Sequence, residues 1–133
     1  MGFTEMNVWK APKDLATRIY KLTKSFPRNE QYELCKRLKN VAITAPDNIA
    51  KAIEGNYADD VRYYIGLAVK NYAELNSHLS VARELKFLDE TTLLDIREDI
   101  LSCKKLAYGY IRYHNNKYKD EGTEQGNIRS EAA

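Results

Sequence analysis

The 133-residue chain has little of what several protein classes require. It has two cysteines, Cys35 and Cys103, which lie far apart and outside any CxxC motif. Neither a disulfide scaffold nor a cysteine-based zinc site is therefore expected, and both residues are predicted to be core thiols. No stretch approaches the roughly 20 apolar residues of a membrane span, and the N-terminus lacks the apolar segment of a signal peptide. The sequence thus predicts a cytoplasmic protein with no membrane contact.

The sequence also offers few of the residue patterns that are typical of catalytic sites. The chain contains no glycine-rich phosphate loop, no HExxH motif and no nucleophile elbow. His78 follows Glu74 by four residues, which can place both on one helix face, but a metal site needs further ligands. His114 continues an apolar seam and is interpreted as a histidine at the core edge. We therefore expect no enzyme, no cofactor and no metal site.

The chain does contain helical periodicity, with apolar residues at steps of three and four in four separate runs. Strand-like alternation is absent. Short connections make sequential helices antiparallel, so the expected fold is all-α, an up-down antiparallel four-helix bundle over residues 10–119. Residues 1–9 are expected to be a lead-in and residues 120–133 a disordered polar tail. The four seams are Leu15, Ile19, Leu22 and Phe26; Leu34, Leu38, Val41, Ala45, Ile49 and Ala52; Val61, Ile65, Ala68, Tyr72, Leu75, Leu79 and Ala82; and Leu93, Ile96, Ile100, Cys103, Ala107, Tyr110 and His114.

Residues that commonly begin or end helices lie at the boundaries of these runs. Pro12 is placed near the start of the first helix, where its missing N–H costs little. Asn29, Asp59 and Asp89 are the candidate N-caps of the next three helices, and Gly55 is the expected stop of the second.

Pro46 falls midway along the second run, in the stretch ITAPDNIAKA. Proline lacks a backbone N–H and clashes with the carbonyl one turn back. The sequence therefore predicts that the helix is kinked at Pro46 or split into two segments near Thr44. Asp47 and Asn48 carry short polar side chains that can satisfy the backbone groups that the proline frees. A packing role is favoured over direct ligand contact.

A second apolar stripe runs beside the core seam of the last helix. It consists of Leu94, Leu101 and Tyr108, each seven residues apart. One interpretation is that these residues widen the arc that faces the core. The other is that they form a subunit interface, because exposed apolar stripes usually mark association. The sequence leaves both interpretations open.

Charge is unevenly distributed, although the net charge is only +2. Residues 10–39 hold nine Lys or Arg against three acids, and residues 101–119 hold five with no acid. The stretch YGYIRYHNNKYK interleaves tyrosines with basic residues, a composition suited to phosphate contact and base stacking. The alternative is an ordinary solvated helix face, with cations that favour the helix C-terminus. The candidate RNA- or DNA-binding residues are Lys10, Lys21, Lys24, Arg28, Lys105, Arg112 and Lys119.

Three segments together resemble a known bacterial family of four-helix bundles. The segments are VWKAPKDLATRIYKLTKSFPRNEQYEL, ITAPDNIAKA and YYIGLAVKNYAELNSHLSVARELKFL, and the likeness covers about residues 8–114. The family is named for proteins encoded within 23S rRNA intervening sequences. The resemblance implies a homopentamer arranged as a ring. It also implies kinship with the accessory proteins of diversity-generating retroelements, basic pentamers that bind a reverse transcriptase and nucleic acid.

The chain departs from the family pattern after Pro46. Where the family continues P-S-NIAEG and a basic turn, this sequence has Asp47, Lys51 and Ala52, followed by the acidic turn GNYADD. The leading hypothesis is a non-enzymatic oligomeric protein that binds RNA or DNA, with a reverse transcriptase as a possible partner. The alternative is an oligomeric scaffold that binds proteins and no nucleic acid.

Overall fold

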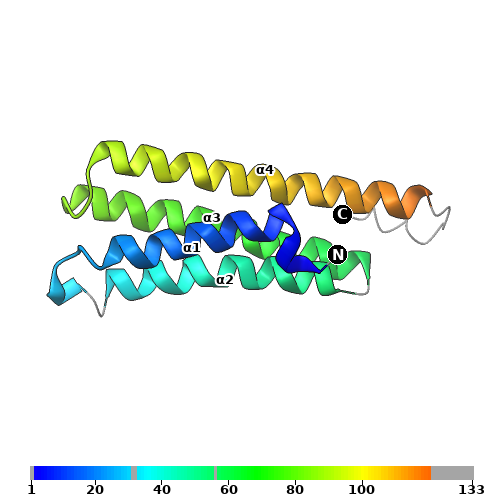
Figure 1. Ribbon diagram of the computed structural model, residues 1–133, viewed down its shortest axis with the longest axis horizontal. Helices are drawn as coiled ribbons and strands as arrows, with labels where there is room; N and C mark the ends of the chain where they lie inside the picture. Colours follow the sequence, from blue (N-terminus) through cyan, green and yellow to red (C-terminus); the bar gives the residue numbers. More distant parts are fainter. Residues whose placement is uncertain (1, 31–32, 56, 121–133) are drawn as a thin grey trace.

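Four α-helices make up most of the computed structural model, which describes residues 2–30, 33–55 and 57–120 (Figure 1). No strand occurs in these three ranges, so the predicted all-α, four-helix architecture is confirmed. The elements in chain order are the 3₁₀ turn η1 (Phe3–Glu5), α1 (Asn7–Thr23), the 3₁₀ turn η2 (Arg28–Glu30), α2 (Leu34–Glu54), α3 (Ala58–Glu84) and α4 (Glu90–Asp120).

Successive helices run in opposite directions, and Figure 1 shows two distinct ends. At one end, called here the α3–α4 end, α1 stops, α2 begins and α3 turns into α4. At the other, the α2–α3 end, α2 connects to α3 and α4 reaches its orange end, which extends beyond the blue start of α1. Each helix packs against its sequence neighbour, and contacts between α1 and α4 close the bundle.

The core lies where the four predicted seams meet. Ile19, Leu38, Ile65 and Ile100 contribute one seam position from each helix, and all four are essentially inaccessible to solvent. Burying a side chain of this size stabilises the fold by about 1.5–3 kcal/mol. Cys35 and Cys103 are buried free thiols, as predicted. The remaining seam positions are buried too, apart from Leu22, Val41, Tyr110 and His114, which are partly exposed.

Two of the predicted helix ends are correct. The backbone N–H of Thr92 donates to Oδ1 of Asp89 at 2.7 Å, which is the bond that an N-cap makes at the start of α4. Gly55 directly follows the last residue of α2. The Asp89 signal depends only on local backbone chemistry, which explains why the sequence alone was sufficient. Gly55 has an extended backbone with a φ of −67°, so the helix ends there without the left-handed conformation that favours glycine.

The other predicted starts are wrong by several residues. α1 begins at Asn7, so it includes the end of the lead-in predicted for residues 1–9, and Pro12 lies well inside the helix. The extra turn buries Val8 and brings Trp9 against Phe3, with ring centroids 5.3 Å apart. Because these side chains pack in the folded structure, α1 begins earlier than the local sequence signals indicate. Of the predicted tail, all but Asp120 falls outside the described residues.

The predicted caps of α2 and α3 do not act as caps. Asn29 belongs to η2, because α2 begins only at Leu34. Asp59 lies inside the first turn of α3, and Tyr57 takes the N-cap position. An acid in the first turn still interacts favourably with the positive end of the helix dipole, and the Asp59 carboxylate accepts a hydrogen bond of 2.8 Å from Arg62.

α2 continues through Pro46 without interruption, so the helix is not split near Thr44. A bend at this position stays a prediction. Pro46 itself is buried, and the Asn48 side chain bonds to Asn71 of α3 rather than to the backbone that the proline frees. Asn48 thus links α2 to α3 instead of satisfying the backbone of α2.

Candidate interaction surfaces

Six of the seven predicted nucleic-acid-binding cations have exposed side chains, and none of the six forms an ion pair within the described part of the chain. Exposed cations without a carboxylate partner are available for phosphate contact. The side chain of the seventh, Lys119, lies outside the described residues. The six are Lys10, Lys21, Lys24, Arg28, Lys105 and Arg112.

These cations do not gather on one surface. Lys21, Lys24 and Arg28 lie where α1 ends, whereas Lys105 and Arg112 lie in the half of α4 that reaches the α2–α3 end (Figure 1). Lys10 sits near the start of α1, about 21 Å along the helix from Lys24. Antiparallel packing places the end of α4 on the same side of the bundle as the end of α2 and opposite to the end of α1.

The cations at the α3–α4 end have exposed neighbours. Lys36 and Arg37 lie in the first turn of α2, and Lys86 lies in the turn between α3 and α4. With Lys21, Lys24 and Arg28 they form what we call the basic end: Lys21, Lys24, Arg28, Lys36, Arg37 and Lys86. The sequence could not place Lys86 in this group, because its position depends on which end of the folded bundle holds the α3–α4 turn.

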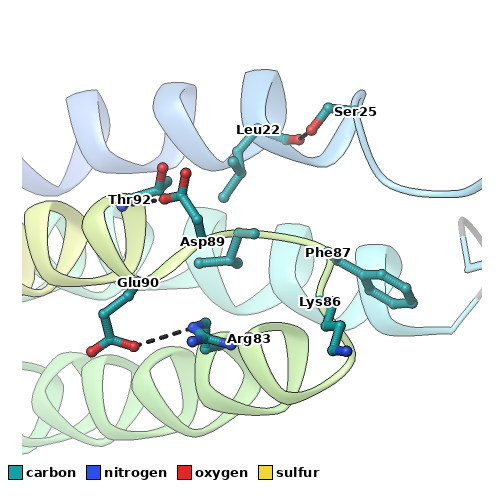
Figure 2. Close-up of a pocket in the computed structure, with 9 residues that line it drawn as sticks. Leu22, Ser25, Arg83, Lys86, Phe87, Asp89, Glu90 and Thr92 are labelled. Atoms are coloured by element: carbon teal, nitrogen blue, oxygen red, sulfur yellow. Dashed lines mark hydrogen bonds and ion pairs between the residues drawn. The ribbon is translucent and has the colours of Figure 1, made fainter.

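A cleft of about 550 Å³ opens at the same end (Figure 2). Charged groups within it are largely compensated, since Nε of Arg83 lies 3.1 Å from Oε2 of Glu90 and Asp89 accepts the capping bond of α4. The residues that line the cleft are Leu22, Ser25, Arg83, Lys86, Phe87, Leu88, Asp89, Glu90 and Thr92.

The second hollow, called here the α1–α2 groove, is more apolar. It has a volume of about 510 Å³. Two of its lining residues, Tyr20 and Ile43, keep 42% and 43% of their surface exposed. Lysines approach both aromatic rings: Nζ of Lys13 lies 6.0 Å from the Trp9 ring, and Nζ of Lys39 lies 5.8 Å from the Tyr20 ring. The lining residues are Trp9, Lys13, Ala16, Thr17, Tyr20, Ile43, Pro46 and Asp47.

The second stripe of α4 is exposed rather than part of the core. Leu94, Leu101 and Tyr108 keep 52%, 51% and 46% of their surface accessible. The interpretation that they widen the core-facing arc is therefore wrong, because that arc is already filled by the seam of the same helix. We call these three residues the α4 ridge.

The largest pKa shifts occur in the core and not in either hollow. Burial raises the pKa of Cys103 to about 12, and it also raises the pKa of Tyr72 well above its usual range. At the surface, the hydrogen bond to Asp95 raises the pKa of Arg18. Among the described residues, no group of three or more His, Cys, Asp and Glu could hold a metal ion. These shifts thus reflect packing and ion pairing.

The fold and its surfaces define a four-helix protein with exposed basic and apolar faces, and none of its described helices is long and apolar enough to cross a membrane. The sequence matches the family of the 23S rRNA-intervening sequence protein over residues 4–109. The chain belongs to that family, as the resemblance indicated. A comparison with curated proteins gives no match.

Proposed function

We propose that this protein is a non-enzymatic, oligomeric accessory protein that binds nucleic acid through its basic end. The observation that carries the proposal is the presence there of six exposed cations, contributed by the end of α1, η2, the start of α2 and the α3–α4 turn. They outnumber the exposed acids at that end, which are Glu33, Glu84, Asp89 and Glu90. None of them forms an ion pair in the described ranges. The family description refers to 23S rRNA, and RNA is therefore the first ligand to test.

Phosphate binding by such a surface has a characteristic salt dependence. Each lysine or arginine that neutralises a phosphate releases counterions, so log K falls with log salt by about 0.7–0.9 per contact. Five or six contacts would weaken binding by more than about a hundredfold between 50 and 200 mM salt. Ligand binding by an apolar surface would change far less.

Fluorescence anisotropy with a structured RNA and a single-stranded DNA, at several salt concentrations, tests the proposal. The double variant Lys24→Glu/Arg28→Glu should weaken binding at least tenfold and reduce the salt slope. Lys105→Glu/Arg112→Glu makes the same charge change at the opposite end and serves as the matched control. Equal losses in both variants would argue for attraction by overall charge, and salt-insensitive binding by the wild type would exclude phosphate recognition.

We also propose that the protein assembles as a homopentamer in the cytoplasm and acts beside a reverse transcriptase. The support is the likeness to accessory proteins of diversity-generating retroelements, together with an exposed apolar ridge that association would cover. Co-purification of the protein with a reverse transcriptase encoded nearby, before and after nuclease treatment, tests the partnership.

A second candidate function is a protein-binding scaffold without nucleic-acid contact. Exposed tyrosines favour it, because Tyr63 and Tyr113 keep 62% and 60% of their surface accessible and tyrosine is enriched at protein interfaces. A partner that persists in pull-downs from nuclease-treated lysate, combined with no RNA binding by the purified protein, would favour the scaffold.

A further inference from the structure

We infer that the α4 ridge of one copy docks into the α1–α2 groove of a second copy, with both bundles pointing in the same direction. The inference deepens the oligomeric part of the proposed function and rests on it, but it needs no nucleic acid. It assigns the α1–α2 groove an occupant, which is the α4 ridge of a second copy.

The two surfaces are similar in length. Leu94 and Tyr108 are fourteen residues apart on one face of α4, so the ridge is about 21 Å long. Trp9 and Tyr20 are eleven residues apart on α1, so the wall of the groove is about 17 Å long. The seven-residue spacing also places Leu101 in line with the other two ridge residues, as in a coiled-coil seam.

The ridge and the groove lie at the same height along the bundle. Arg18 pairs with Asp95 and Asp99 at 2.6 and 2.7 Å, which sets the register of α1 against α4. Trp9 lies nine residues before Arg18, and Tyr108 nine residues after Asp99, about 14 Å in each case. Both displacements point to the α2–α3 end, because α1 and α4 are antiparallel. Two copies can therefore lie side by side without an axial shift, as a closed ring requires.

Charge selects the parallel orientation. At the α3–α4 end, residues 21–39 carry six bases against two acids, whereas residues 89–99 of the ridge side carry five acids against one base. Toward the α2–α3 end the groove side is neutral: residues 100–116 of the ridge side carry three bases and no acid, whereas residues 7–14 and 47–54 of α1 and α2 carry three bases against three acids. Parallel copies bring opposite charges together at the α3–α4 end, and antiparallel copies would bring the bases of residues 100–116 against those of residues 21–39.

One specific pair follows from this alignment. Asp95 and Asp99 already bind Arg18 within the copy, which leaves Glu98 as the exposed carboxylate at the same height. Lys39 lies over the Tyr20 ring on the groove side. The alignment therefore predicts that Glu98 of one copy meets Lys39 of the next.

Cysteine cross-linking tests the contact directly. The natural cysteines are buried, so Ile43→Cys and Leu101→Cys each introduce a single exposed thiol. Mild oxidation of an equimolar mixture of the two nuclease-treated variants should give a disulfide between the different chains, while each variant alone should give little. Cross-linking of Leu101→Cys to itself as efficiently as to Ile43→Cys would overturn the inference.

Sedimentation equilibrium of further variants tests the energetics. Leu101→Glu should lower the assembled mass toward the 15.4 kDa of one chain. Val81→Glu is the matched control, because Val81 is 47% exposed on α3 and belongs to neither surface. Lys39→Glu and Glu98→Lys should each weaken assembly at least tenfold, and the double variant should restore most of it. A monomeric wild type, or an assembled mass unaffected by Leu101→Glu, would overturn the inference, whatever the RNA-binding assay gives.

Discussion

Nδ2 of Asn48 on α2 donates a hydrogen bond of 2.8 Å to Oδ1 of Asn71 on α3. Asn48 is 5% exposed and lies among the apolar residues where these two helices pack. A buried polar group must find its partner, so only one register of α2 against α3 satisfies this pair. The bond therefore adds specificity to a contact whose other members are interchangeable hydrophobic side chains.

Replacing Asn48 by alanine should lower the free energy of unfolding by about 1 kcal/mol, because its hydrogen bond to the partly exposed Asn71 would be lost. Urea denaturation followed by circular dichroism measures the change. Asn40→Ala, at an exposed position of the same helix, should change stability by less than about 0.5 kcal/mol. Similar losses for both variants would show that the buried bond contributes little.

Lys86 adopts a positive φ of 64° directly after α3, where glycine is the preferred residue. The chain reverses there through bonds from Lys86 N to Arg83 O at 3.0 Å and from Phe87 N to Ala82 O at 2.9 Å. Lys86→Gly should raise the unfolding free energy by about 1 kcal/mol, since the left-handed conformation strains any residue with a Cβ. Lys86→Ala removes the same side chain but keeps the strain, so only the glycine variant should be more stable.

The cap of α4 makes stability depend on pH. The bond from the Thr92 backbone lowers the pKa of Asp89 below its ordinary value of about 3.9. The stabilising contribution is therefore complete above about pH 4 and is lost as the pH falls through the lower, folded-state pKa. Thermal melting should show that Asp89→Ala lowers Tm at pH 7, whereas Asp89→Asn keeps a neutral cap and loses this part of the acid dependence.

Both natural thiols should be unreactive in the folded protein. Burial raises the pKa of Cys103 to about 12, which leaves almost no thiolate at pH 8, and Cys35 is equally inaccessible. Ellman's reagent should label neither residue in native buffer and both in urea. A Val81→Cys variant supplies an exposed thiol outside both proposed assembly surfaces as a positive control. Rapid labelling of the wild type would contradict the buried placement of the two residues.

Helix content and core were readable from the sequence because both are periodic. A residue such as Ile65 or Ile100 reaches the core through the 3.6-residue repeat of its own helix, which needs no knowledge of the partner. The start of α1 was misjudged because Val8 and Trp9 gain packing contacts that local signals do not record. The left-handed turn at Lys86 was not predicted, because the position does not hold the glycine that usually marks such a turn.

The sequence by itself determined that four amphipathic helices bury their apolar seams together and that Asp89 begins the last of them, since both follow from local periodicity and backbone chemistry. Only the tertiary structure decided where the remaining residues meet. Lys24 and Arg112 have the same charge and exposure, yet antiparallel packing sends them to opposite ends, and the register set by Arg18 brings the α4 ridge level with the α1–α2 groove. Such placements depend on contacts between residues far apart in the chain, which a helical repeat does not encode.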